Sequence, residues 1–171
     1  VLLSERGIAN DHTVVVYDNT SNLFSSRAYW VFAYYNHEAV KLYNGGTLAW
    51  EADGQDLIAD EVSYEATEYI AGEINEDVRA DYERVIASLD DENVVTCDTR
   101  SNGEFDGSDA RAAAGGHIPG AIHLEWTHAI SEAGRFKPAP ELAALFYAEG
   151  FTPDKEILTY CQTGVRGAHT W

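Results

Sequence analysis

The sequence predicts an α/β fold with a mostly parallel sheet flanked by helices, and two observations support this prediction. Short apolar segments typical of strands alternate along the chain with segments whose apolar residues recur at helical spacing. In addition, residues 7–18 and residues 150–161 match each other at a constant offset, so that Asp18 lies where the second copy has Cys161. An offset of this length indicates two similar domains in tandem, because solenoid repeats are much shorter.

In the first copy, local signals mark a helix end, a strand and a second helix. Gly7 ends a short apolar helix, and an apolar strand then leads to Asp18. Apolar residues at helical spacing predict a helix that begins at Ser25 or Ser26, either of which can cap it, and that ends at Tyr35.

A second strand is expected over residues 39–42, and a turn is expected at residues 44–46, where asparagine precedes two glycines. The stretch that follows is acidic and only weakly periodic, which is typical of a linker. We therefore divide the chain into a first domain at 1–54, an interdomain linker at 55–78 and a second domain at 79–171.

The second copy repeats the alternation of helix and strand. A helix with one apolar face is predicted over residues 79–89, and a strand follows over residues 94–97. Pro140 suits the start of a helix that ends before Gly150, and an apolar strand then reaches Cys161. Because sites in parallel sheets gather at the carboxyl ends of strands, the thiol is expected at such a site, at the end of a central strand.

The charge balance indicates which classes of binding partner and which kind of environment to expect. Acidic residues outnumber lysine and arginine by 29 to 11, giving a formal net charge of −18. This disfavours nucleic-acid binding, because phosphate contacts need basic patches. Acidic residues spread along the chain, together with scarce lysine, favour adaptation to high salt, with an ordinary acidic protein as the alternative.

No apolar run could span a bilayer, so no membrane partner is expected. No signal peptide is visible, and the two cysteines fit a reducing cytoplasm.

The two cysteines have different expected roles. Cys161 lies at the tip of a strand and is followed by a short glycine loop that ends in Arg166. A tight loop of backbone N–H groups with one guanidinium favours the thiolate, which is the reactive form of cysteine. Cys97 lies in an apolar strand, where a buried and inert thiol is expected rather than a disulfide partner. No cysteine and histidine set has zinc-ligand spacing, so neither a metal nor another cofactor is expected.

Three segments of the chain resemble the tandem-domain rhodanese family of sulfurtransferases. These are residues 97–101 with the nearby Phe105, residues 116–121 with the sequence Gly-His-Ile-Pro-Gly-Ala, and the loop at 161–166. The resemblance covers essentially the whole chain, and the acidic composition makes it haloarchaeal-like. It implies two rhodanese-like domains in tandem, both incomplete, because the first copy lacks its beginning and the second lacks its end. The first copy, with Asp18 in place of the cysteine, is expected to be non-catalytic.

The resemblance also implies an activity and a set of site residues. A sulfane sulfur would move from thiosulfate, a small anionic donor, to a thiophilic acceptor (cyanide or a thiol) through a persulfide on Cys161. Arg166 and Arg100 would bind the sulfonate end of thiosulfate. Asp98 and Arg100 would flank the pocket, with a structural ion pair as the alternative. The loop residues expected to surround the sulfur are Gln162, Thr163, Gly164 and Val165.

Other functions stay open at this point. A 3-mercaptopyruvate sulfurtransferase is the alternative within the family, although a divalent anion such as thiosulfate gains more from Arg166. A cysteine-dependent phosphatase or arsenate reductase also surrounds an anion with cysteine and arginine, but with one more residue between them. A non-catalytic sulfur-relay module is the third alternative. The sequence does not indicate the physiological acceptor or the oligomeric state.

Overall fold

Parallel strands and flanking helices make up the computed structural model, which describes residues 2–171. The chain divides into two compact units, the first reaching Arg79 and the second spanning Ala80–Trp171. Every strand pair in the described residues is parallel, apart from one isolated antiparallel bridge between Ile130 and Phe136. The predicted α/β class with a parallel sheet is therefore confirmed.

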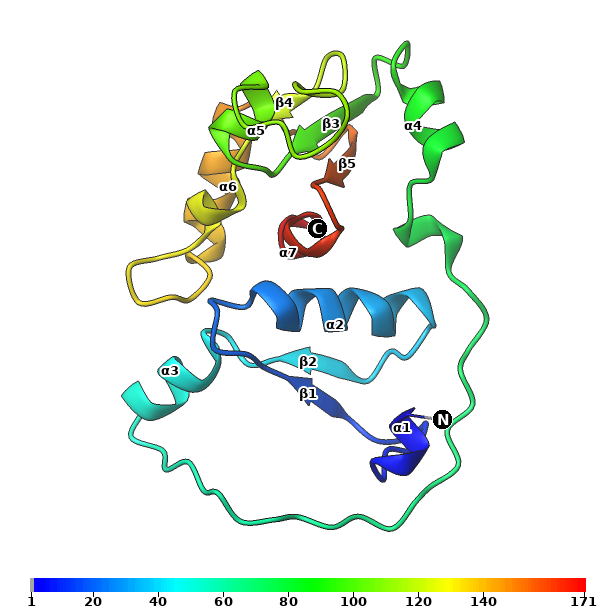
Figure 1. Cartoon of the computed structure of the whole chain (residues 1–171), viewed down its shortest axis with the longest axis vertical. Coiled ribbons are helices and arrows are strands. Elements are labelled where there is room, and N and C mark those ends of the chain that lie inside the picture. The colour runs from blue at the N-terminus through cyan, green and yellow to red at the C-terminus, as the bar shows by residue number, and fades with distance from the viewer. Residues whose placement is uncertain (1) are drawn as a thin grey trace. The chain divides into compact units, whose positions relative to one another are not determined.

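The first unit contains a two-stranded sheet covered by a helix. Strand β1 (Val14–Val16) pairs with β2 (Val40–Leu42), with Val14 opposite Val40, and helix α2 (Leu23–Tyr34) contacts both strands (Figure 1). Two shorter helices complete this unit, α1 (Leu2–Glu5) and α3 (Gly46–Ala52).

For this unit, one sequence prediction is wrong and another is incomplete. Helix α2 is capped by Asn22 in the left-handed conformation, so Ser25 and Ser26 are buried inside the helix and neither caps it. The predicted turn at residues 44–46 leads directly into helix α3, because Gly45, at φ 93°, is its N-cap. Neither helix start carries the side-chain cap from which a sequence pattern would locate it.

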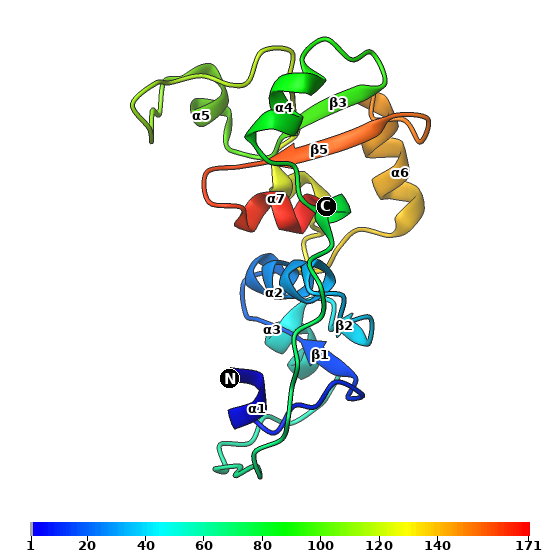
Figure 2. The same cartoon turned by 90° about the vertical axis from the view of Figure 1, so that its right-hand side faces the viewer.

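The predicted linker at 55–78 has no helix or strand before a short 3₁₀ helix, η1 (Glu76–Val78), but it is bound along the first unit. The Thr67 N–H donates to the Ser4 carbonyl at 3.0 Å, and the Asn75 N–H donates to the Tyr34 carbonyl at 2.8 Å. Figures 1 and 2 show this segment as a long irregular stretch. Its backbone bonds make it part of the first unit's structure, and its role as a connection between tandem domains stays a prediction.

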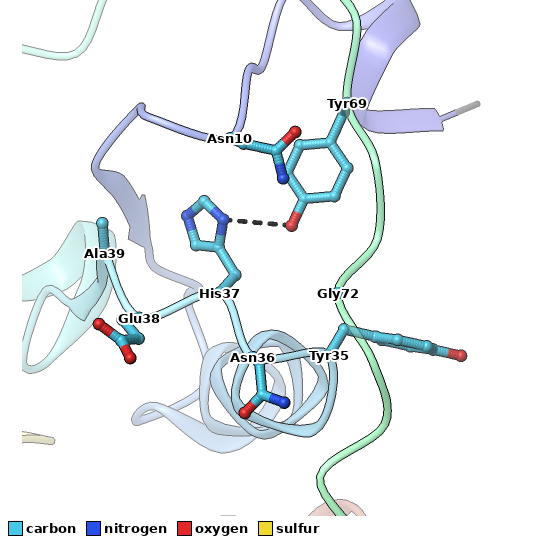
Figure 3. A pocket seen from close by; sticks show the side chains of 8 residues that line it. All are labelled: Asn10, Tyr35, Asn36, His37, Glu38, Ala39, Tyr69 and Gly72. Atoms are coloured by element: carbon cyan, nitrogen blue, oxygen red, sulfur yellow. Dashed lines mark hydrogen bonds between the residues drawn. The ribbon is translucent and has the colours of Figure 1, made fainter.

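A pocket of about 290 Å³ lies where this segment passes the end of α2 (Figure 3). The ring of His37 faces Tyr69 across it, with Nδ1 at 3.1 Å from the tyrosine hydroxyl. The lining side chains include no thiol and no guanidinium. The pocket is therefore separate from the residues that the sequence singles out for sulfur chemistry.

The second unit is built on a three-stranded parallel sheet with the order β4-β3-β5. Strand β3 (Val94–Asp98) lies between β4 (Ile122–His123) and β5 (Glu156–Tyr160). Figure 2 shows β3 and β5 side by side. Asp98 is in register with both His123 and Tyr160. The apolar core is formed by buried Cys97, Leu124 and Phe151, packed against Val95, Ile122, Leu145, Phe146 and Ile157.

Helices of the second unit follow the predicted order with changed bounds. Helix α4 (Tyr82–Ser88) is capped by Asp81 and is shorter than the predicted 79–89, and α6 (Ala139–Ala148) begins one residue before Pro140. Helix α5 (Asn102–Asp106), the 3₁₀ helix η2 (Trp126–Ala129) and strand β4 lie outside the predicted elements. None of the helices in the described chain is both long and apolar enough to cross a bilayer.

Candidate functional site

The candidate site lies at the carboxyl ends of the three parallel strands. Because Asp98, His123 and Tyr160 are in register, the residues that follow each strand emerge at one edge of the sheet. Cys161 is the first residue after β5, which is an edge strand of the described sheet. The prediction that Cys161 ends a central strand is therefore wrong for this sheet, because β3 occupies the central position.

The Cys161 loop turns its backbone toward the sulfur. The Gly164 N–H donates to Cys161 Sγ at 3.1 Å, and Gly164 adopts the left-handed conformation at φ 79°. That conformation is readily available to glycine and lets the loop close over three residues. Gly164 is also the N-cap of helix α7 (Val165–Thr170).

The two thiols differ as expected from the sequence. Both cysteines are free, and Cys161 is partly exposed, whereas Cys97 is completely buried in β3. Burial, together with the neighbouring charge of Asp98, raises the pKa of the Cys97 thiol to about 12. Cys97 is therefore a protonated core residue, and Cys161 is the thiol available for chemistry.

The first unit holds an anion at the position that matches Cys161 in the repeat. The Asp18 carboxylate follows β1 and accepts four backbone hydrogen bonds, from the N–H groups of Thr20, Asn22, Phe24 and Ser25, at 2.8 to 3.1 Å. Burial alone would raise the pKa of Asp18, but these bonds outweigh burial and hold it below its ordinary value. The loop between β1 and α2 therefore stabilises the negative charge of Asp18, which lies at its start.

Arg166 lies in the first turn of α7, and its guanidinium is held by a buried carboxylate. Its two terminal nitrogens donate to the two oxygens of Glu104 at 2.6 and 2.9 Å. The Glu104 hydrogen bonds raise the pKa of Arg166, and contact with the Cys161 side chain adds to this effect. The sequence places Arg166 at the end of the loop, but helix α7 begins at Val165, so Arg166 belongs to the helix rather than to the loop.

Glu104 is a site residue that the sequence analysis missed. It lies in α5, its side chain is 1% exposed, and it forms a capping box with Ser101, whose hydroxyl donates to Glu104 Oε2 at 2.9 Å. Hydrogen bonds from Arg166, and then from Ser101, lower the pKa of Glu104 to about 2 despite burial. The spacing of serine and glutamate three residues apart is the sequence signal that could have located both the helix and this carboxylate.

Asp98 and Arg100 form a second buried ion pair. The Arg100 guanidinium donates to both Asp98 oxygens and, through Nη2, to the Gly116 carbonyl at 2.8 Å. The Tyr160 hydroxyl also donates to Asp98. Burial would raise the pKa of Asp98, but the bonds from Arg100 and Tyr160 hold it below its ordinary value. The two residues thus fix the end of β3 against the 116–121 segment.

The other predicted loop residues differ in their environment. Gln162 and Thr163 are exposed, and the Gln162 side-chain amide donates to the Arg111 carbonyl at 3.3 Å. Val165 is half-buried as the first residue of α7. Within the 116–121 segment, the His117 ring stacks on Phe105 with ring centroids 3.7 Å apart, which joins the segment to α5.

A comparison with protein families matches the Rhodanese-like domain over residues 2–53 and 81–171. The chain belongs to the rhodanese-like domain family. Both matched segments contain one copy of the internal repeat, with Asp18 in the first and Cys161 in the second.

Among curated proteins, rhodanese-like relatives match nearly the whole chain. A protein of Mycolicibacterium smegmatis named "Putative thiosulfate sulfurtransferase" is 43% identical over 99% of this chain and 64% of its own length. The thiosulfate sulfurtransferase of Corynebacterium glutamicum is 38% identical over 99% of this chain and 59% of its own length. The chain thus spans about three fifths of these relatives. Both are actinobacterial, so they lend no support to a haloarchaeal origin.

A solved structure has a similar fold. The anaerobic ergothioneine biosynthesis enzyme from Chlorobium limicola, in complex with trimethyl histidine, superposes with a TM-score of 0.88 at 25% sequence identity. The match covers 99% of this chain and 46% of that enzyme.

Proposed function

We propose that this chain carries the sulfur-accepting site of a thiosulfate sulfurtransferase, with Cys161 as the nucleophile. One observation supports this above the others. The partly exposed Cys161 sulfur receives the Gly164 N–H at the open end of a parallel sheet and lies beside the Arg166 guanidinium. An amide N–H and a guanidinium beside a sulfur stabilise the negative charge that it carries during transfer. The relatives named as thiosulfate sulfurtransferases agree with this chemistry.

The reaction proceeds in two displacements. The Cys161 thiolate attacks the outer sulfur of thiosulfate, the sulfur–sulfur bond of thiosulfate breaks, and sulfite leaves with the bonding electron pair. The enzyme then carries a persulfide, whose terminal sulfur bears the negative charge. An acceptor such as cyanide attacks that sulfur, the persulfide bond breaks, and thiocyanate leaves while the thiolate is restored. Charge and atoms balance without an added proton or oxidant.

The surrounding residues take different roles in this proposal. The Gly164 amide and Arg166 stabilise the charge on sulfur before and after transfer. Arg166 and Arg100 stay candidates for contact with the sulfonate, and the ion pairs with Glu104 and Asp98 limit how far either guanidinium can move toward it. Asp98 holds Arg100 at the carboxyl end of β3. Gln162, Thr163 and Val165 complete the loop around the sulfur.

Mass spectrometry of the protein after treatment with thiosulfate tests this function. We expect a gain of one sulfur atom on the peptide that contains Cys161, and loss of that mass on addition of cyanide, with thiocyanate formed. The peptide that contains Cys97 is the internal control and should stay unmodified. No sulfur gain on Cys161, under conditions in which iodoacetamide alkylates it, would overturn the proposal.

A phosphatase or arsenate reductase is a weaker candidate on geometric grounds. Only four residues separate Cys161 from Arg166, and the Arg166 terminal nitrogens are both bound to Glu104. A phosphate ester would need those same nitrogens. Hydrolysis of a phosphate ester that is abolished by Cys161→Ser, without sulfite release from thiosulfate, would favour this alternative.

The alternative within the family is a 3-mercaptopyruvate sulfurtransferase. Direct comparison of sulfur transfer from thiosulfate and from 3-mercaptopyruvate decides between these two sulfur donors.

We further propose that the protein contains two rhodanese-like domains in tandem and works in a reducing, salt-rich cytoplasm. The internal repeat and the two matched segments support the tandem arrangement. The two free thiols and the net charge of −18 support the environment. Rising transfer activity with added potassium chloride is the expected result, and activity that falls steadily with salt would contradict it.

A further inference from the structure

The peptide bond that leads into Cys161 is held by a residue outside the cysteine loop. The carbonyl oxygen of this bond belongs to Tyr160, the last residue of β5. It accepts one hydrogen bond from the Thr99 N–H at 3.0 Å and a second from the Thr99 hydroxyl at 2.9 Å. Because a carbonyl oxygen has two lone pairs, Thr99 occupies both acceptor positions of this oxygen.

Thr99 is itself firmly held in the fold. It is the first residue after β3, and its N–H bond follows directly on the pairing of Asp98 with Tyr160. Its own carbonyl accepts a hydrogen bond from the Trp126 N–H at 3.2 Å, which ties it to η2. The side chain is 0% exposed, so its hydrogen bond is shielded from water and electrostatically stronger than an exposed one.

The side chain of Tyr160 is fixed by other partners. Its hydroxyl donates to Asp98 and accepts a hydrogen bond from the Ile118 N–H at 3.2 Å. These two bonds hold the ring in place whether or not Thr99 carries a hydroxyl. The bond from the Thr99 side chain therefore acts on the orientation of the peptide bond between Tyr160 and Cys161.

The orientation of that peptide bond determines where the sulfur lies. A peptide unit is a rigid plane, so a rotation of the plane changes the direction in which the Cys161 side chain leaves the backbone. Cys161 Sγ accepts the Gly164 N–H at 3.1 Å, and hydrogen bonds weaken steeply when their geometry is disturbed. In a persulfide the terminal sulfur is one bond farther from the backbone, so the same rotation displaces it more.

We propose that the Thr99 hydroxyl is a positioning group for Cys161, which holds the preceding peptide bond so that the sulfur stays against the Gly164 N–H and beside Arg166. Its effect on sulfur transfer rests on the proposed function, whereas its effect on the thiol does not. Because Thr99 has no exposed surface, it acts through Cys161 and not on the donor. A misplacement of about 1 Å is enough to slow an enzymatic reaction severely.

Alkylation of Cys161 by iodoacetamide tests this role without any turnover. Thr99→Val keeps the shape of the side chain and the backbone N–H but removes the hydroxyl, whereas Thr99→Ser keeps the hydroxyl. At neutral pH, the rate constant of Thr99→Val should fall about three- to tenfold, as expected for the loss of one buried hydrogen bond. That of Thr99→Ser should stay within about twofold of the unmodified protein.

Two further variants separate positioning from a general loss of stability. Thr99→Ala differs from Thr99→Ser by the hydroxyl alone, should alkylate about three- to tenfold more slowly than it, and decides the question if Thr99→Val does not fold. Ser88→Ala removes another buried hydroxyl, which donates to the Val85 carbonyl at 2.7 Å in α4. It should lose unfolding free energy in urea but leave the alkylation rate unchanged.

Equal rates in the valine variant and the unmodified protein, with the protein folded by circular dichroism, would overturn the proposal. A serine variant as slow as the valine or the alanine variant would overturn it too, because the hydroxyl would then not be the group responsible.

A single turnover with thiosulfate extends the test to sulfur transfer. In Thr99→Val, the limiting rate of sulfite release should fall about three- to tenfold. The thiosulfate concentration that gives half the limiting rate should stay within about twofold, because Thr99 does not touch the donor. A weaker dependence on thiosulfate with an unchanged limiting rate would contradict positioning. If the unmodified protein releases no sulfite, the proposed function fails, and the alkylation rates still test the role of Thr99.

Discussion

The Glu104 carboxylate accepts a hydrogen bond from each terminal nitrogen of Arg166, in a pair that joins α5 to α7. Glu104 also accepts from Ser101, so the end of β3, the short helix after it and the helix after the cysteine loop meet at one carboxylate. The orientation of Arg166 toward the sulfur therefore depends on a residue that lies 57 positions before Cys161 in the chain.

Replacing Glu104 by glutamine should destabilise the protein, because the variant leaves the Arg166 charge buried without its counterion. Removing one partner of a buried pair costs roughly 3–5 kcal/mol of unfolding free energy. Urea unfolding followed by circular dichroism measures this loss. The matched control is Glu156→Gln, which breaks the exposed pair with Arg84 and should cost less than about 1 kcal/mol. Equal, small losses in the two variants would contradict a structural role for Glu104.

The same pair makes a defined contribution to acid stability. The pKa of Glu104 is lowered to about 2 from its ordinary value of 4.5, so the folded state favours the ionised carboxylate. The stability it provides is complete above the unfolded-state pKa and is lost as the pH falls from about 4.5 toward 2. Unfolding free energies of the unmodified protein and of Glu104→Gln should therefore converge over this range. A difference that stays constant from pH 6 to pH 3 would contradict this linkage.

Sequence patterns indicate the candidate site residues more directly than they indicate the helices and strands that hold them. The strands that lead to Asp98 and Cys161 were predicted because apolar runs bounded by turn residues give a direct local signal. Cys161 and Arg166 were identified from the residue types and spacing of one loop. The structure confirms a free, partly exposed thiol at Cys161 and a buried one at Cys97.

The partners of these residues depend on tertiary contacts that no local pattern shows. Glu104 and Arg166 are distant in the sequence, and only the parallel register of β3 and β5 brings their helices together. The edge position of β5 likewise follows from the strand order and not from its composition. The start of α3 was missed because its N-cap, Gly45, has the composition of an ordinary turn. For α5, the capping box of Ser101 and Glu104 is a local sequence signal that marks the start of a helix.

The two cysteines should differ sharply in reactivity toward a neutral alkylating reagent. Burial raises the pKa of Cys97 to about 12, so in the folded protein its thiol is both protonated and inaccessible at neutral pH. Iodoacetamide at pH 7.5 should label Cys161 alone, and Cys97 should become labelled only after unfolding in urea. Peptide mass mapping before and after unfolding measures this difference. Rapid labelling of Cys97 in the folded protein would show that β3 opens readily.

Alanine in place of Gly164 should slow the alkylation of Cys161, and the accompanying loss of unfolding free energy should not account for that effect. The left-handed conformation at φ 79° costs a residue with a side chain roughly 1–2 kcal/mol, and relaxation of that strain turns the Gly164 N–H away from the sulfur. Gly54 offers a matched control, because it has the same φ and a Cβ there would meet nothing within 4 Å. Both alanine variants should lose similar unfolding free energy in urea, but only Gly164→Ala should slow alkylation of Cys161 by iodoacetamide at neutral pH. If the two variants alkylate at the same rate as the unmodified protein, the Gly164 amide does not activate the thiol, and the charge on sulfur must then be stabilised by Arg166 without its help.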